Sequence, residues 1–353
     1  MLGRAIVWGL RCLEPETAHR LSLRLLRSGL SPPPAASDRA LALDCFGLAF
    51  ANPLGIAAGY DKNAEVPGAL AGLGFGFVEV GTVTPRPQAG NPRPRLFRLT
   101  ADRALINRLG FNNQGLDTVT ARLAALARPF DVPLGVNVGA NRDSADPAVD
   151  YVAGLTRVAP FADYVTINIS SPNTPGLRNL QMRAALDDLL RRVVAARGEA
   201  LAGSGRRLPL MLKIAPDLDE AGLADIAEAV LAHGIEAVAI GNTTIGRPAG
   251  LRSAKRAEAG GLSGRPLFDQ STAVLGRFHK LTQGRGSLIG IGGIDSADTA
   301  YAKLRAGASL LQLYTGLVYG GPSLIGEILD GLAQRLRRDG HARIAEAVGA
   351  DNR

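Results

Sequence analysis

Small polar side chains gather directly after an apolar run in the middle of this chain. The run YVTI at 164–167 is followed by NISSPNTPGL, which contains two serines, two asparagines and two prolines. Turns use Asn, Ser and Pro for their own geometry, so this segment alone does not establish a site. A serine held in such a loop is a candidate base if its proton can leave through a water or a neighbouring hydroxyl.

Asparagines in separate segments indicate what this serine would act on. An asparagine side chain offers amide donors and a carbonyl acceptor, so several around one pocket suit a planar substrate with imide groups and a carboxylate. The four candidates are Asn107, Asn168, Asn173 and Asn242. The interpretation requires that the fold bring them together.

A lysine inside an apolar run points to a negatively charged partner. Lys213 lies in PLMLKI, and burying an unpaired ammonium group is costly. The partner is either a carboxylate of the protein interior or a cofactor, such as a reduced flavin ring, whose negative charge the lysine would stabilise. Lys62, in AGYDKN, is a second candidate cation.

Glycines in the last quarter of the chain have the pattern of a phosphate site. GIGGIDS places Gly292 and Gly293 after an apolar run, and LYTG adds Tyr314 and Thr315 as donors. Glycines let backbone N–H groups approach a phosphate closely, although a tight turn before a helix cap has the same pattern. No GxGxxG fingerprint follows a strand, so a flavin or a sugar phosphate fits better than NAD.

Eight short apolar runs alternate with helical segments and would position these groups. This alternation predicts a parallel sheet covered by helices, and eight such units predict a (β/α)₈ TIM barrel. Each run ends in a hydrogen-bonding group, so all of these groups would meet at one face. The runs are PLGIAA, FVEVG, PLGVNV, YVTINI, PLMLKI, EAVAIG, SLIGIG and SLLQLY, which begin near 53, 77, 133, 164, 209, 236, 287 and 309.

Two insertions interrupt the alternation. The longer runs from Thr82 to about Phe130, and the shorter, TTIGRPAGLRSAKRAEAGGLSGRPL, follows the sixth run. Loops of this length are usually functional or carry strands of their own. We expect both to lie over the carboxyl-terminal mouth of the barrel, where active sites of this fold lie.

The segment before the barrel predicts two short amphipathic helices. MLGRAIVWGLRCL and EPETAHRLSLRLLRSGL have apolar faces and arginine-rich flanks, and SPPPAASD reads as a linker. The first is too short and too charged to span a bilayer, and no signal-peptide cleavage site follows it. We expect an amphipathic helical extension at 1–40, a catalytic barrel at 45–340 and a tail at 341–353.

Composition excludes several classes of protein. The chain has 353 residues with 46% apolar content, enough for a large core, so it is not mainly disordered. Its net charge is +8, but aromatic residues are only 5% and no nucleic-acid-binding motif is present. Two cysteines and four histidines lack metal-ligand spacing, which argues against a metal site.

Nine motifs resemble one family from almost end to end of the chain. They are AAGYDKNAE, VEVGTVTPRPQAGNPRPRLFRL, INRLGFNNQG, NISSPNTPGLR, KIAPDL, NTT, GGLSGRPL, GIGGIDS and LYTG. The sequence resembles the quinone-dependent, class 2 dihydroorotate dehydrogenases. The resemblance implies a (β/α)₈ barrel that binds FMN, oxidises dihydroorotate to orotate in pyrimidine biosynthesis and passes the electrons to a membrane quinone.

The resemblance also implies roles for single residues. Ser171 would take a proton from C5 of dihydroorotate while a hydride leaves C6 for flavin N5. The orotate-binding positions would be Lys62, Asn107, Arg108, Leu109, Gly110, Phe111, Asn168, Asn173, Asn242 and Thr243. The FMN-binding positions would be Ala58, Gly59, Tyr60, Asp61, Lys62, Thr82, Asn137, Asn168, Lys213, Gly241, Gly264, Gly293, Tyr314 and Thr315.

Two positions depart from the family pattern. Gly241 stands where several relatives have threonine, so only a backbone contact is expected there, and Thr315 replaces a serine while keeping the hydroxyl. Class 1 relatives have cysteine where this chain has Ser171 and lack the N-terminal helices, so both features favour class 2.

The resemblance gives the first 40 residues a role as helices that admit the quinone. His19 and Arg98 resemble family residues near the quinone head, and a peripheral location on the cytoplasmic face of the inner membrane is implied. Two rival functions remain: an FMN barrel oxidoreductase that uses NAD or fumarate, and a non-catalytic phosphate-binding barrel. A protein without bound flavin would favour the second.

Overall fold

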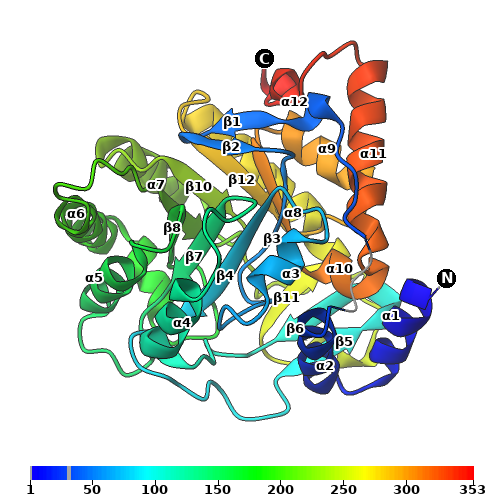
Figure 1. Ribbon diagram of the computed structural model, residues 1–353, viewed down its shortest axis with the longest axis horizontal. Coiled ribbons are helices and arrows are strands. Elements are labelled where there is room, and N and C mark those ends of the chain that lie inside the picture. Colours follow the sequence, from blue (N-terminus) through cyan, green and yellow to red (C-terminus); the bar gives the residue numbers. More distant parts are fainter. Residues whose placement is uncertain (1, 30–32) are drawn as a thin grey trace.

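The eight apolar runs form the barrel that the sequence predicts. In the computed structural model, which describes residues 2–29 and 33–353, eight parallel strands close on themselves in chain order. Figure 1 shows this barrel surrounded by its helices. The barrel strands are β3 (Leu54–Ile56), β4 (Phe77–Val83), β7 (Leu134–Val138), β8 (Tyr164–Asn168), β9 (Leu210–Ile214), β10 (Ala237–Ile240), β12 (Ser287–Ile291) and β13 (Leu310–Leu313).

The strands read as continuous apolar runs because helices cover their outer faces and side chains fill the barrel interior. Nearly every strand residue is buried. The covering helices are α3 (Pro67–Ala71), α4 (Gly115–Ala124), α5 (Pro147–Val158), α6 (Arg183–Ala200), α7 (Glu220–Ala232), α8 (Phe268–Leu281), α9 (Ala297–Arg305), α10 (Thr315–Gly320) and α11 (Ser323–Arg338). Side-chain caps begin several of them, for example Asp219 on α7, which accepts from Gly222 N at 2.9 Å.

A hairpin that the sequence analysis did not identify closes the amino-terminal end of the barrel. It consists of β1 (Leu43–Cys45) and β2 (Leu48–Phe50), which pair antiparallel. The ring of Phe50 meets that of Phe77 edge-on at 5.5 Å. Tyr164 fills the same end, where a Cβ on Gly135 would lie 2.1 Å from its ring. Aromatic packing therefore seals this end, and the polar strand ends lie at the other.

The two insertions meet in one small sheet. The long one carries β5 (Leu96–Leu99) and β6 (Ala104–Asn107), and the short one carries β11 (Gly261–Gly264). They pair antiparallel in the order β11-β6-β5, with Asn107 opposite Gly261. The insertions therefore brace each other beside the barrel mouth. Short 3-10 turns complete the connections: Arg39–Leu41, Thr100–Asp102, Leu177–Gln181, Ala254–Ala257 and Arg265–Leu267.

The N-terminal segment forms the two expected helices, α1 (Leu2–Cys12) and α2 (Pro15–Arg27). Figure 1 shows both beside β5 and β6, apart from the helices that ring the barrel. Buried Glu16 anchors α2 through ion pairs to Arg95 at 2.9 Å and Arg93 at 2.8 Å. Among the described residues, no helix has the length and apolar content needed to cross a bilayer. The expected linker at 31–38 lies partly outside the described residues.

The C-terminal segment docks on the barrel. It forms α12 (Ile344–Ala347) and a 3-10 turn at Ala350–Asn352. The Asn352 side chain donates to the Ala306 carbonyl at 2.8 Å. The division of the chain into segments at 40, 45 and 340 stays a prediction.

Candidate functional site

The carboxyl ends of the barrel strands surround a cavity, which we call the barrel-mouth pocket. Residues from the strand ends, from β6 and from β11 line it together. Eighteen of the positions expected from the sequence are among its lining residues: Ala58, Gly59, Lys62, Thr82, Asn107, Leu109, Gly110, Phe111, Asn168, Ser171, Asn173, Lys213, Asn242, Thr243, Gly264, Gly293, Tyr314 and Thr315.

The four asparagines converge in this pocket. Asn173 Nδ2 donates to Asn107 Oδ1 at 3.2 Å, which ties the loop after β8 to the end of β6. Asn168 Nδ2 donates to Thr82 Oγ1 at 3.0 Å, and Asn242 Nδ2 donates to Ser170 Oγ at 2.8 Å. These bonds fix the asparagine side chains around a common space, as recognition of a planar polar substrate requires.

The two adjacent serines have different surroundings. Ser171 lines the pocket, and its Oγ accepts from Asn173 N at 3.2 Å. Ser170 is fully buried, donates to Asn168 Oδ1 at 2.8 Å and accepts from Asn242. Ser170 therefore belongs to the supporting hydrogen-bond network, and Ser171 is the serine that lines the pocket.

Lys62 lines the pocket, and the pKa of its ammonium group is lowered. Its Nζ donates to the Gly59 carbonyl. Burial, and next the charge of Arg95, lower the pKa of Lys62 to about 8, while Glu16 and Asp61 oppose them. A bound anion would favour the charged form of this ammonium.

Lys213 is buried in β9 without a direct anionic partner. Burial lowers its pKa, and the charge of Glu79 opposes this effect. Among the described residues, no carboxylate lies within the 4.0 Å limit of an ion pair with its Nζ. Of the two partners that the sequence left open, a direct salt bridge in the barrel interior is therefore absent from the described part of the chain. Lys213 is also one of the residues that line the pocket.

The remaining lining fits a polar, anionic cofactor with a planar ring. Gly264 and Gly293 adopt φ of +93° and +75°, and a Cβ on Gly293 would lie 2.4 Å from Phe268, so only glycine allows this close approach. Two buried acceptors that line the pocket, Thr243 Oγ1 and Gln312 Oε1, have no hydrogen-bond partner among the described residues.

Five expected positions are not among the residues that line the pocket. Asp61 accepts from Glu65 N and Val66 N at 2.8 and 2.7 Å and so fixes the turn after β3. Arg108 pairs with Glu258 at 2.9 Å, which links the two insertions. The full set is Tyr60, Asp61, Arg108, Asn137 and Gly241.

Sequence analysis missed other lining residues. Gln312 stands in the apolar run SLLQLY, just as Lys213 stands in PLMLKI, and the same signal would have found it. Glu79 in FVEVG carries this signal too, although it lies beneath the pocket lining. The apolar and glycine members carry no comparable signal: Ala57, Leu96, Leu105, Leu267, Ile291, Ile294, Leu313 and Gly316.

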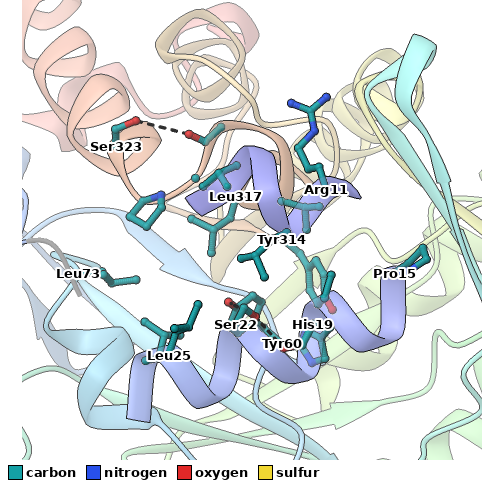
Figure 2. Close-up of a pocket in the computed structure, with 18 of the residues that line it drawn as sticks. Arg11, Pro15, His19, Ser22, Leu25, Tyr60, Leu73, Tyr314, Leu317 and Ser323 are labelled. Carbon is teal, nitrogen blue, oxygen red and sulfur yellow. Dashed lines mark hydrogen bonds between the residues drawn. The ribbon is translucent and has the colours of Figure 1, made fainter. Parts of the chain in front are cut away.

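A second cavity of about 510 Å³ lies beneath the N-terminal helices, and we call it the helix cavity. Figure 2 shows α2 along one side, with His19, Ser22 and Tyr60 grouped near Tyr314. Ser22 Oγ and Tyr60 OH are 3.0 Å apart. Its walls are otherwise mostly apolar, which suits a hydrophobic ligand.

Both residues expected near a quinone head line this cavity. Burial, and next the charge of Lys62, lower the pKa of His19 to about 3, so the imidazole is neutral near pH 7. Arg98 Nη1 donates to the Arg11 and Leu13 carbonyls at 2.8 and 3.2 Å, tying β5 to the end of α1. The two cavities share three lining residues, Leu96, Leu105 and Tyr314.

Comparison with known proteins identifies relatives of this chain. The family model for dihydroorotate dehydrogenase matches residues 40–336. A relative from Rhodospirillum rubrum named dihydroorotate dehydrogenase (quinone) is 56% identical over 350 residues, covering 99% of this chain and 94% of the relative. One of the same name from Parvibaculum lavamentivorans is 56% identical over 340 residues, covering 96% and 95%. The crystal structure of DHODH from Eimeria tenella in complex with ferulenol is 41% identical, with a TM-score of 0.91 and 99% coverage of both chains.

Proposed function

The chain belongs to the quinone-dependent dihydroorotate dehydrogenase family, and on that premise we propose that its two cavities serve the two halves of one reaction. Dihydroorotate is oxidised to orotate in the barrel-mouth pocket, as a step of pyrimidine biosynthesis. The quinone that receives the electrons enters the helix cavity. The shared residues Leu96, Leu105 and Tyr314 support this division, because they separate the two spaces by a single layer of side chains.

The family is flavin-dependent, and FMN is the cofactor that we propose here. When bound, it takes the hydride from the substrate and passes the electrons on to the quinone. Gly264, Gly293 and Thr315 would hold its phosphate, since the two glycines expose backbone at a close approach. Lys213 would stabilise negative charge on its ring, because no carboxylate of the described residues pairs with this ammonium.

The asparagines and Lys62 would bind the substrate. Dihydroorotate has imide groups, which pair with amide donors and acceptors, and a carboxylate, which an ammonium group binds. Ser171 Oγ would take the proton from C5 while its own hydroxyl proton leaves to a water or a neighbouring hydroxyl, since Ser171 is the serine that lines the pocket. Asn173 N, which donates to this oxygen at 3.2 Å, would hold it in position.

We further propose that α1 and α2 bring the enzyme to a membrane as a peripheral protein, on the cytoplasmic face of the inner membrane. Trp8 on α1 is 69% exposed, and the two helices carry several arginines. An exposed aromatic ring beside basic residues suits the boundary between headgroups and acyl chains.

The observation that carries the proposal is the convergence of four asparagines and Ser171 in one pocket that shares a wall with an apolar cavity. The test is an anaerobic titration of the purified protein followed by its visible spectrum. Dihydroorotate should bleach the flavin absorption, and a quinone should restore it. Absence of bleaching would reject the reaction, and recovery with NAD or fumarate but not with a quinone would reject the acceptor.

A further inference from the structure

One arginine joins the loops that follow three neighbouring barrel strands, and the proposed reaction does not use it. Arg178 stands in the 3-10 turn Leu177–Gln181, at the end of the loop after β8. Each nitrogen of its guanidinium group donates to a different partner: Nε to the Ser170 carbonyl at 3.0 Å, Nη1 to Asp217 Oδ2 at 2.7 Å and Nη2 to the Thr243 carbonyl at 3.0 Å. These partners lie in the loops after β8, β9 and β10.

The bond to Ser170 closes the loop that carries the proposed base. Arg178 reaches back to the Ser170 carbonyl, so the segment between them is held at both of its ends. A peptide unit is planar, and the plane of this carbonyl includes the Cα of Ser171. Ser171 lines the barrel-mouth pocket. Any shift of the Ser170 carbonyl therefore moves the Cα of the proposed base.

The bond to Thr243 fixes a second part of the pocket wall. Thr243 lines the pocket, and the peptide plane whose carbonyl accepts from Arg178 includes the Thr243 Cα. Asn242, the preceding residue, is tied to the loop after β8 as well, because its Nδ2 donates to Ser170 Oγ at 2.8 Å. Arg178 thus bridges the backbone beside the proposed base and the backbone of a proposed substrate-binding residue.

Asp217 fixes the direction of the guanidinium group. Besides Arg178, it accepts from Gln270 Nε2 at 3.1 Å, from Ile245 N at 3.3 Å and from the Thr244 hydroxyl. The side chains of Arg178 and Asp217 are only 22% and 17% exposed. A shielded arginine–carboxylate pair with further hydrogen bonds holds one geometry, whereas an isolated surface pair often contributes little.

The shape of the guanidinium group matters here as well as its charge. Its donors are spread over a rigid plane, while a lysine carries all three of its protons on one nitrogen. The contacts of Arg178 use three different nitrogens of this plane. A lysine at this position would keep the charge beside Asp217 but would not hold both carbonyls.

We propose that Arg178 is a positioning residue that aligns Ser171 with the substrate, and that Asp217 orients Arg178 for this role. The inference rests on the proposed function, because the substrate is dihydroorotate and Ser171 is its base. Arg178 acts through the backbone of two loops and touches neither substrate nor cofactor. Proton removal requires a set distance between base and substrate, so it should depend on this spacing more than binding does.

The main test is Arg178→Lys in the protein with its bound cofactor. Anaerobic stopped-flow absorbance follows flavin reduction at several dihydroorotate concentrations, which separates the limiting rate from the dissociation constant. We expect the limiting rate to fall at least ~10-fold, since small misplacements of reacting groups cost large factors in rate. The dissociation constant of dihydroorotate should rise by no more than about threefold, because most of the pocket lining is unchanged.

The reaction of the reduced flavin with a quinone is measured on the same variant. Arg178 is not among the residues that line the helix cavity, so this rate should stay within about twofold of wild type. An equal loss in both half-reactions would assign the effect to a general loosening of the barrel and overturn the proposal.

Arg197→Lys is the matched control. Arg197 pairs with Glu236 at 2.8 Å, and these side chains are 20% and 17% exposed, close to the values for Arg178 and Asp217. Glu236 also accepts from the backbone of Leu210, the first residue of β9, so this pair lies at the amino-terminal end of the barrel.

We expect Arg197→Lys to destabilise the protein much as Arg178→Lys does, while its limiting rate of flavin reduction stays within about twofold of wild type, because the reacting groups do not move. Urea unfolding of both variants checks the first point. Equal falls of the limiting rate in the two variants would overturn the proposal.

Asp217→Asn tests the second part and decides the matter if Arg178→Lys does not fold. It removes the charge that orients the guanidinium group but leaves both carbonyl contacts possible, so the limiting rate should fall by about threefold or more. A wild-type limiting rate in this variant would show that Asp217 does not orient Arg178. If dihydroorotate does not bleach the wild-type flavin, the proposed function itself fails. If it does, and Arg178→Lys matches wild type, only this inference fails.

Discussion

At the scale of single residues, two adjacent serines occupy different positions in one network. Ser170 exchanges hydrogen bonds with Asn168 and Asn242, whereas Ser171 lines the barrel-mouth pocket. A base must reach the proton that it removes, and a serine whose oxygen is already used by two asparagines is poorly placed to do so. The contrast favours Ser171 as the base.

The first prediction tests this assignment. Ser171→Ala should keep FMN bound but slow the reduction of the flavin by dihydroorotate at least ~10²-fold, the usual effect of losing a general base. Ser171→Cys should keep some activity. Stopped-flow absorbance under anaerobic conditions measures the rate. A wild-type rate in the alanine variant would place the base elsewhere, with Ser170 as the next candidate.

The second prediction concerns the charge of Lys62. Burial and the charge of Arg95 lower its pKa to about 8, so the ammonium is charged below this pH and neutral above it. On the proposed role of Lys62, its ammonium group binds the carboxylate of orotate, so above about pH 8 binding requires the uptake of one proton. The dissociation constant of orotate should therefore rise by up to about tenfold per pH unit in this range.

Titration of orotate against the absorption spectrum of the bound cofactor at several pH values measures this effect. Lys62→Arg is the control, because a guanidinium keeps its charge throughout and should flatten the profile. The assignment would be wrong if wild type and Lys62→Arg lost affinity in parallel as the pH rises.

At the scale of elements, α2 is attached to the long insertion of the barrel by buried charge. Glu16 has a lowered pKa, because its hydrogen bonds and ion pairs to Arg95 and Arg93 outweigh its burial, which acts in the opposite direction. Breaking a buried ion pair by removing one partner is strongly destabilising. The helix therefore holds a fixed position over the helix cavity.

The third prediction is that the N-terminal helices are needed for quinone but not for dihydroorotate. Deleting residues 1–40 should leave an FMN-bound barrel that dihydroorotate still bleaches, since the barrel-mouth pocket takes its lining from residues after 56. The same preparation should lose liposome binding and turnover with long-chain quinones, because about half of the helix cavity is lined by the deleted segment.

Single-turnover flavin reduction and steady-state quinone reduction are compared on one truncated preparation. Its FMN content serves as the control for folding of the barrel. Survival of both quinone turnover and liposome binding would show that the first 40 residues have neither the membrane role nor the tunnel role.

At the scale of the whole molecule, the barrel and its cofactor should unfold as one unit. Lining residues of the pocket come from the ends of most barrel strands, from β3 through to β13, so a bound ligand ties distant parts of the chain together. A ligand that binds only the folded state stabilises it by mass action, by about 2.7 kcal/mol at a concentration of 100 times its dissociation constant.

The fourth prediction follows from this coupling. Heating the purified protein should release FMN, identified by chromatography, and added FMN should raise the midpoint of thermal unfolding of the apoprotein. Riboflavin, which lacks the phosphate, should stabilise the apoprotein less, because the proposed phosphate site at Gly264 and Gly293 would then be empty. Release of FAD, or equal stabilisation by riboflavin and FMN, would contradict the cofactor assignment.

The sequence by itself determined the fold class, the family and most of the pocket lining. The spacing of apolar residues and the glycines at the ends of strands are local signals that can be read along the chain. The eight-stranded barrel and the family that they predict are both confirmed. In a parallel barrel the carboxyl ends of all strands share one face, so the order of strands and polar residues along the chain was enough to place Lys213, Ser171, Asn168 and Asn242 together.

Only the tertiary structure decided which of the neighbouring polar groups line the pocket and which support them from other strands. The pairing of β5 and β6 with β11 joins insertions far apart in the chain, and no local pattern reports such a contact. Likewise, the separation of Ser170 from Ser171 and the orientation of Gln312 depend on partners from other strands. The direction of a buried hydrogen-bonding group is set by the donors and acceptors that folding brings to it, and the order of residues along the chain does not contain that information.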